Sequence, residues 1–509
     1  MSFARVYTAQ INLLKGQLVN VEVDISNGLH AFSIVGLPDK AVEEARDRVS
    51  SAIKNSGFTS PKSKNQKIVV SLSPADTKKE GSFFDVAISL GYLLASEDIS
   101  FNVDKKIFLG ELSLNGDVLP IRGVLPLVML AKSEGFEELY VPKENAKEAA
   151  LIEGIDIYGV STLKELITHL TDKNVSIIKE PITPIEDIND EYSVDLADIK
   201  GQESAKRGLE IAASGGHNIA MYGPPGTGKT MLARAFRSLL PSLSKNEALE
   251  ITSIYSIAGN LKTPVITKAP FRSPHHTSSY VSVIGGGATP KPGEVTLSHR
   301  GVLFLDEFPE FDKRVIESLR QPLEDNFVSI SRAKGTAIFP SNFILIAAMN
   351  PCPCGFRGSK NKECVCTAGD IARYQRKLSG PIMDRIDIWV EVGSIEYDKL
   401  NSKNDLSENT ESVRNRVEKA YKKQVIRFSE DNEKINRNSD MGAKDISKYI
   451  SLEKDVENIL NQAASKLNLS ARAYHRVLKL ARTIADLDDS EKIDSKHILE
   501  AIQYRPRIT

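Results

Sequence analysis

The sequence predicts an α/β protein whose central part combines buried strands and helices around a phosphate-binding loop. Residues 223–230 read Gly-Pro-Pro-Gly-Thr-Gly-Lys-Thr, a pattern in which two glycines and a Lys-Thr pair stand at fixed spacing. An apolar run at 218–222 precedes this loop and a helical pattern at 231–240 follows it, which is the strand–loop–helix order that such a loop requires. Two further apolar runs, 302–305 and 343–349, have the length of buried strands.

The composition is that of an ordinary globular protein with several domains. The 509 residues are too many for one hydrophobic core, so we expect about two to four domains. Lys plus Arg (66) nearly equals Asp plus Glu (67), which excludes a strong overall basic field, so any contact with nucleic acid must come from a local patch. We find no apolar run of about eighteen residues and no signal-peptide pattern, and therefore expect a cytoplasmic protein without a membrane partner.

Changes in pattern along the chain predict four segments. Residues 1–171 mix short β-rich runs with helices, the clearest of which spans about 39–54. Residues 172–192 are polar, proline-containing and acidic, as expected of a linker. The domain with the phosphate-binding loop follows at 193–393 and contains a cysteine-rich insertion at 350–367. Residues 394–509 are a charged connecting segment and then a helical region, in which Ser470 is a predicted N-cap.

The loop has the residues that a nucleoside triphosphate needs. Glycines let successive backbone N–H groups turn inward, and the start of the following helix adds partial positive charge. Lys229 is expected to reach the β- and γ-phosphates of ATP, and the hydroxyl of Thr230 to bind Mg²⁺. The candidate nucleotide-binding residues are Gly223, Pro224, Pro225, Gly226, Thr227, Gly228, Lys229 and Thr230.

Polar residues follow both of the later apolar runs. Asp306 and Glu307 end the first run, where Asp306 can help to hold Mg²⁺ and Glu307 can polarise the attacking water. Two solvated acids at a strand end are the alternative, which the phosphate-binding loop upstream disfavours. Asn350 ends the second run and could orient the water or contact the γ-phosphate, although an isolated Asn at this place is usually a turn residue.

Two arginines are notable for their positions. Arg385 stands just ahead of a predicted strand at 388–392, and Arg472 lies in the first helical turn after Ser470. A cation is unfavourable at that end of a helix dipole, so a bound anion would explain Arg472, with an ordinary surface arginine as the alternative.

These residues together resemble an AAA+ ATPase of the magnesium-chelatase-like YifB/ComM family. Gly223–Thr230, Asp306 with Glu307, Asn350, Arg385 and Arg472 match its Walker A, Walker B, sensor one, arginine finger and sensor two. Motifs more specific to the family are Phe271–His276, Ile284–Gly287, Met349–Gly355 and Ser470–Arg476.

The resemblance implies a P-loop AAA+ core with a C-terminal helical lid, assembled as a ring, expected to be a hexamer, with ATP at subunit boundaries. Arg385 would then act in trans on the neighbour's γ-phosphate and Arg472 in cis. The implied function is an ATP-driven DNA motor, a helicase or branch-migration factor acting on recombination intermediates. A chelatase-type ATPase that remodels a protein partner is the alternative.

A basic hairpin is predicted between the two apolar strands. Residues 328–340 alternate apolar side chains around a glycine-containing tip with Arg332 and Lys334. A solvated basic turn is the alternative from the residues alone. The resemblance places this hairpin, and the glycine-rich region with Lys291, at the central pore of the ring, where their charge would contact the DNA backbone.

All four cysteines fall in one short stretch, as C-x-C, nine residues and C-x-C. Such clustering indicates a joint role, and a structural zinc site formed by Cys352, Cys354, Cys364 and Cys366 is the natural interpretation in the cytoplasm. The C-x-C spacing is tighter than the usual C-x₂-C, so independent reduced thiols remain an alternative.

The N-terminal segment resembles the Lon-protease-like (ribosomal S5 domain 2-like) α+β fold. The motifs that carry this resemblance are Lys79–Asp85, Gly110–Leu112, Val118–Val124 and Val141–Asn145. Phe83 takes the place of the family's nucleophilic serine and Leu127 that of its lysine. Neither side chain can supply a nucleophile or a base, so we expect no peptidase activity.

Overall fold

The computed structural model describes residues 3–172, 174–185, 194–287, 290–332, 335–358, 362–378, 380–393, 408–429 and 435–506. The chain forms two compact units. Unit 1 consists of residues 1–187 and 244–267, and unit 2 of residues 188–243 and 268–509. Among the described residues, no helix is both long and apolar enough to cross a lipid bilayer.

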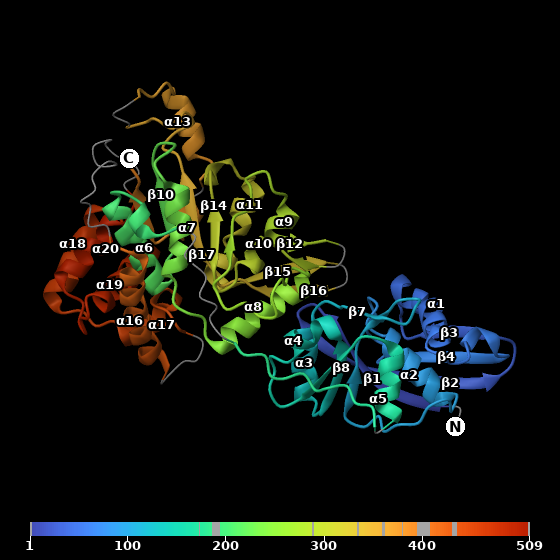
Figure 1. Cartoon of the computed structure of the whole chain (residues 1–509). Coiled ribbons are helices and arrows are strands. Elements are labelled where there is room, and N and C mark those ends of the chain that lie inside the picture. Colours follow the sequence, from blue (N-terminus) through green and yellow to red (C-terminus); the bar gives the residue numbers. More distant parts are fainter. Residues whose placement is uncertain are drawn as a thin grey trace. The chain divides into compact units, whose positions relative to one another are not determined.

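Unit 1 is a seven-stranded mixed sheet with helices packed on it, as predicted for a mixed α and β segment (Figure 1). In spatial order its strands are β3 (Ala31–Val35), β4 (Gln66–Ser73), β2 (Lys15–Asn27), β1 (Phe3–Asn12), β5 (Lys106–Phe108), β8 (Glu138–Pro142) and β9 (Asp156–Val160). A small hairpin is formed by β6 (Glu111–Leu112) and β7 (Val118–Leu119). The helices are α1 (Lys40–Asn55), α2 (Asp85–Ala95), α3 (Val124–Ser133), α4 (Ala146–Ala149), α5 (Leu163–Thr171) and α8 (Lys245–Ala258). The predicted amphipathic helix is confirmed as α1, capped by Asp39, whose side chain accepts a hydrogen bond from the Val42 backbone N–H.

Helix α8 belongs to unit 1 although its sequence lies between two elements of unit 2. Its buried Ser256 hydroxyl donates to the Glu148 carboxylate and accepts a 3.0 Å hydrogen bond from the Gly123 backbone N–H. Leu249 of the same helix packs against the apolar cluster around α3 and β8. Burial raises the pKa of Glu148, and the bond from Ser256 opposes that rise. Sequence reasoning did not anticipate this packing.

Unit 2 is built on a five-stranded parallel sheet (Figure 1). In spatial order its strands are β11 (Phe271–Arg272), β14 (Val302–Leu305), β17 (Ile344–Met349), β10 (Ile219–Tyr222) and β18 (Ile388–Glu391). The apolar runs recognised in the sequence are therefore confirmed as strands, and the α/β fold class with them. The strands read as continuous apolar runs because both faces of a parallel sheet are covered.

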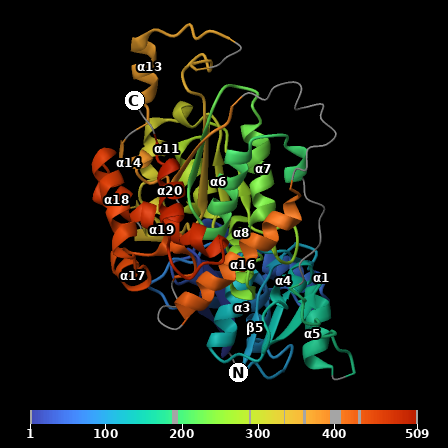
Figure 2. The same cartoon turned by 90° about the vertical axis from the view of Figure 1, so that its left-hand side faces the viewer.

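The helices of unit 2 include a C-terminal group that shares one core with the sheet. Unit 2 also contains α6 (Glu203–Gly215), α7 (Lys229–Leu239), α11 (Lys313–Ser318), α12 (Pro322–Asp325), α13 (Ala368–Gln375) and α14 (Gly380–Met383), of which α6 and α7 contact the sheet. The C-terminal group is α16 (Thr410–Ser429), α17 (Ala443–Tyr449), α18 (Lys454–Lys466), α19 (Ala471–Leu487) and α20 (Ser495–Gln503). Both views show this group beside α6, which α16 and α19 contact (Figures 1 and 2). The predicted N-cap is confirmed, since Ser470 accepts from the Ala473 N–H at 3.2 Å.

Two hairpins lie outside the sheet of unit 2. The predicted basic hairpin is confirmed as β15 (Phe327–Arg332) and β16 (Gly335–Pro340). A second, shorter hairpin of β12 (Gly285–Gly286) and β13 (Lys291–Pro292) stands between helices α9 (Tyr280–Ile284) and α10 (Glu294–Leu297). The two are neighbours, because a Cβ added to Gly285 would lie 3.1 Å from Ile330 Cδ1.

Candidate functional site

The glycines of residues 223–230 are required by the backbone of the loop. Gly226 and Gly228 have φ values of +77° and +90°, a region that side chains disfavour, and a Cβ at either position would meet no atom within 4 Å. Gly223 is needed for a different reason, since its Cβ would lie 2.0 Å from the carbonyl oxygen of Val392, the residue that follows β18. The loop therefore has a left-handed, open backbone of the kind that surrounds phosphate groups.

Lys229 and Thr230 start helix α7 and point to residues at the ends of the neighbouring strands. Lys229 Nζ donates to the carbonyl oxygens of Gly223 and Pro224, both at 2.8 Å, and to Asn350 Oδ1 at 3.3 Å. Burial lowers the pKa of Lys229, and the Asp306 carboxylate partly opposes this shift. The hydroxyl of Thr230 donates to Asp306 Oδ2 at 2.9 Å. The fold thus brings together four residues that the sequence predicted for one site.

Glu307 follows β14 in a left-handed conformation, with φ +52°. Its Oε2 atom lies 3.0 Å from Nδ1 of His276, and its side chain is 55% exposed. A positive φ is unfavourable for a residue with a side chain, and such conformations are concentrated at functional sites. The sequence had drawn attention to His276 only as part of a family motif, whereas the structure gives it a specific partner.

Arg385 and Arg472 share one carboxylate. Glu324, in the single-turn helix α12, accepts from Arg385 Nη2 through Oε2 and from Arg472 Nη2, at 2.9 Å, through Oε1. The Arg385 side chain is only 10% exposed, and its Nη1 donates to the Pro381 carbonyl at 2.7 Å. The anion expected beside Arg472 is therefore, in this structure, the Glu324 carboxylate.

The arginine pair lies at the amino-terminal ends of the parallel strands, whereas the phosphate-binding loop lies at their carboxyl-terminal ends. The loop follows Tyr222 at the end of β10, whereas Arg385 precedes β18, whose first residue pairs with Ile219 at the start of β10. Asn218, just before β10, donates through its side chain to the Arg385 carbonyl at 3.2 Å. A strand of four residues spans roughly 13 Å, and about this distance separates the arginine pair from the phosphate-binding loop of the same chain. The position of Arg472 beside Arg385 does not agree with the expected cis role.

The residues expected to contact DNA lie on the two hairpins. Lys291 is exposed on β13, and Arg332 is the last residue of β15. Lys334, the other predicted basic residue of the hairpin tip, lies outside the described residues. One face of the β15–β16 hairpin is buried, and Ile338 on the other is 60% exposed.

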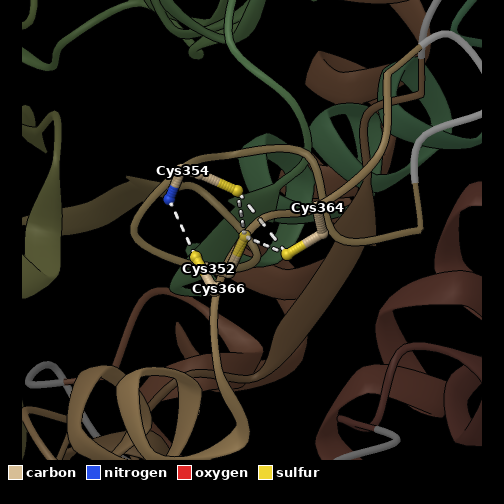
Figure 3. A group of neighbouring side chains, drawn as sticks. All are labelled: Cys352, Cys354, Cys364 and Cys366. Carbon is tan, nitrogen blue, oxygen red and sulfur yellow. Dashed lines mark hydrogen bonds between the residues drawn. The ribbon is translucent and has the colours of Figure 1, made fainter.

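The four cysteines converge in one cluster (Figure 3). The Sγ atom of Cys352 lies 3.4 Å from that of Cys354 and 3.7 Å from that of Cys364, and all four Sγ atoms are within 4.8 Å of one another. Zn–S bonds of about 2.3 Å in a tetrahedron require sulfur separations of about 3.8 Å. Backbone N–H groups of Cys354 and Arg357 donate to the sulfurs of Cys366 and Cys352, which stabilises thiolate ligands. The donor set fits zinc.

The cysteine cluster touches the phosphate-binding loop through Gly355. This residue has φ +84°, and a Cβ on it would lie 2.8 Å from Pro225 Cδ. The loop of the cluster therefore packs directly against the loop that carries Lys229. Gly358 also has a positive φ, +77°, but a Cβ there would meet nothing within 4 Å.

In unit 1, hydrocarbon side chains occupy the two positions that the sequence comparison matched to the catalytic serine and lysine of Lon-type proteases. Leu127 is fully buried in α3, and Phe83 packs against the same apolar cluster. The neighbouring Ser82 hydroxyl donates to the Glu111 carboxylate. The described geometry therefore pairs Ser82 with an acid rather than with a lysine.

Comparisons with known proteins agree with the motifs. Three family descriptions match: "Magnesium chelatase, subunit ChlI" over residues 195–400, "Subunit ChlI of Mg-chelatase" over 21–145 and "Magnesium chelatase, subunit ChlI C-terminal" over 407–505. Competence protein ComM of Haemophilus influenzae is 41% identical over 516 residues, covering 100% of this chain and 98% of that protein. The YifB proteins of Salmonella typhimurium and Escherichia coli are each 39% identical, covering 99% of this chain and 97% of theirs. The similarity extends over the whole chain, and the family's motifs form the phosphate-binding loop, the ends of the sheet strands and the cysteine cluster. The chain therefore belongs to the magnesium-chelatase-like YifB/ComM family of AAA+ proteins.

Proposed function

We propose that this protein is an ATP-driven DNA motor that works as a hexameric ring and acts on branched recombination intermediates. The observation that carries the proposal is the location of Arg385 and Arg472 at the opposite ends of the strands from Lys229. A chain with its phosphate-binding loop at one end of the sheet and its arginines at the other has two separate halves of an ATPase site. A second copy of the same chain supplies the missing half, and head-to-tail repetition of that contact closes a ring.

In this proposal ATP and Mg²⁺ bind at the loop. The Thr230 hydroxyl and Asp306 carboxylate, 2.9 Å apart, are the hard oxygen ligands that Mg²⁺ prefers, so the residues present fit the ion. When bound there, Mg²⁺ would neutralise charge on the phosphates. Lys229 then donates to phosphate oxygens instead of to the carbonyl oxygens of Gly223 and Pro224. Asn350 orients the water that attacks the γ-phosphate, and Glu307 accepts a proton from that water. The neighbour's Arg385 and Arg472 stabilise the charge of the transition state, a contribution worth about 10³–10⁵ in rate for an arginine finger.

The two adjacent hairpins support DNA as the polymer that is moved. Lys291, Arg332 and Lys334 give them positive charge in a chain whose overall charge is balanced, and backbone contacts of this kind do not depend on sequence. ComM, similar over the whole chain, is named a competence protein, and this name favours recombination intermediates as substrates. The alternative of a chelatase-type ATPase acting on a protein would not need this charge.

We also propose that Cys352, Cys354, Cys364 and Cys366 bind a structural Zn²⁺ ion. All four sulfurs lie within 4.8 Å of one another, close enough to share one ion, and a closed four-sulfur site leaves no position for substrate. The metal would therefore hold the insertion against the phosphate-binding loop rather than take part in chemistry.

Strand displacement on defined DNA tests the proposed function. Purified protein with ATP and Mg²⁺ is incubated with labelled forked duplexes and four-way junctions, and the released strands are counted. We expect displacement that requires ATP hydrolysis and is lost when Arg332 and Lys334 are both changed to Gln, while hydrolysis without DNA persists. ATP hydrolysis without DNA binding or displacement on any of these substrates would favour the protein-remodelling alternative.

A further inference from the structure

Glu324, whose carboxylate binds both arginines, lies in the helix that directly precedes the β15–β16 hairpin, which we call the DNA-facing hairpin. Helix α12, which carries Glu324, ends at Asn326, a residue with φ +59°, and β15 begins at the next residue. The other strand of the hairpin is fixed to the same point, because the Ser341 N–H donates to the Asn326 carbonyl at 2.8 Å. Two residues therefore separate Glu324 from the base of the whole hairpin.

The two guanidinium groups and one carboxylate do not balance in charge. Arg385 is nearly buried, and its Nε atom has no hydrogen-bond partner among the described residues. Glu324 supplies one negative charge to two positive ones, and its carboxylate oxygens occupy the positions that an anion bound by both arginines would take. A phosphate group carries more charge and presents more acceptor oxygens than a carboxylate, so it is a stronger ligand for the same pair.

We propose that Glu324 is a positioning residue that holds Arg385 and Arg472 until the neighbouring subunit's γ-phosphate replaces it, and that its release moves the DNA-facing hairpin. The inference rests on the proposed action of the arginines in trans. When the phosphate binds both guanidinium groups, Glu324 loses its hydrogen bonds from Arg385 and Arg472. Helix α12 and the base of the hairpin are then no longer attached to the arginines. A strand of six residues spans roughly 20 Å, so a small rotation at Asn326 becomes a larger displacement at the tip.

Glu324 in this role has two measurable effects. As a competitor of the phosphate, it lowers the fraction of subunits whose arginines are available, and so raises the ATP concentration required. As the connection to the hairpin, it couples nucleotide binding to DNA binding, and such a coupling changes both affinities by the same factor.

The test compares Glu324→Gln with the wild type in the full chain. Glutamine retains the size of the side chain but removes the charge. We expect the KM for ATP to fall roughly threefold to tenfold with kcat within about twofold, because a competitor has been removed. The ratio of DNA dissociation constants measured by fluorescence anisotropy without nucleotide and with ATPγS should fall toward one. Damage to the fold would instead raise KM.

Asp325→Asn is the matched control, since it neutralises an exposed carboxylate on the same helical turn. It should retain the wild-type KM and coupling ratio. An unchanged or raised KM in Glu324→Gln, together with an unchanged coupling ratio, overturns the inference. If Glu324→Gln does not fold, Glu324→Asp decides: its shorter carboxylate cannot reach both arginines as before, so its KM should also be lower than that of the wild type, and an equal or higher KM overturns the inference. If the wild type hydrolyses ATP without any coupling to DNA, the proposed motor itself is wrong.

Discussion

The Nδ1 atom of His276 lies 3.0 Å from the Oε2 atom of Glu307, the residue expected to activate water. The same imidazole stands 4.2 Å, centroid to centroid, from that of His275, whose Nδ1 is engaged with the Thr277 hydroxyl at 2.8 Å. One histidine of the pair therefore contacts the Glu307 carboxylate and the other contacts the Thr277 hydroxyl. This difference gives a matched pair of variants.

His276→Gln should lower kcat roughly tenfold to a hundredfold with little change in the KM for ATP, because a misplaced base affects the chemical step more than binding. His275→Gln should stay close to the wild type. Steady-state ATPase kinetics on both variants make the comparison. Equal losses in the two would show that the motif matters only for local folding.

Lys229→Ala and Glu307→Gln should separate binding from turnover. Removing the lysine charge should abolish detectable binding of a fluorescent ATP analogue, whereas Glu307→Gln should bind it normally and hydrolyse ATP at under about 1% of the wild-type rate. Glu310→Gln, which only breaks an exposed pair with Lys377, is the control. Undiminished hydrolysis in either of the first two variants contradicts the site.

Mixing two inactive variants tests the shared site. Lys229→Ala subunits keep their arginines, and Arg385→Ala subunits keep their phosphate-binding loops. In a randomly mixed ring with equal amounts of each, about one interface in four combines an intact loop with an intact arginine, so hydrolysis should recover to about a quarter of the wild-type rate. A site complete within one chain would show no recovery. Analytical ultracentrifugation with ATPγS should report the ring itself.

Metal analysis tests the cysteine cluster. Protein purified without added zinc should contain about one zinc per chain by mass spectrometry, and Cys364→Ser should lose most of it. Val365→Ser, at an 83% exposed position between two of the cysteines, should keep the metal. Wild-type protein without metal would refute the zinc site.

Gly355→Ala should raise the KM for ATP severalfold, because the added methyl group would press on Pro225 of the phosphate-binding loop. Gly358→Ala introduces the same unfavourable backbone region without that contact, and should leave the KM unchanged. If both variants raise the KM equally, backbone strain and not the contact is responsible.

Features encoded by neighbouring residues could be predicted from the sequence. The phosphate-binding loop, the strands of unit 2, the hairpin and the Ser470 cap each depend on a local pattern, and each is present. Glu324 was missed because nothing local distinguishes it from other surface acids. Its partners are 61 and 148 residues away along the chain, and only the folded sheet brings them together. For the same reason, the position of Arg472 beside Arg385 could not be derived from its helix cap.

Helix α8 has a consequence for how the chain can be shortened. Because unit 1 includes residues 244–267, the polypeptide passes between the units at three places, after residues 187, 243 and 267. A fragment starting at residue 194 would keep α8 but lose the surface that covers Leu249 and the partner of Ser256. We therefore expect such a truncation to aggregate, so that the amino-terminal segment cannot be removed without exposing the apolar side of α8.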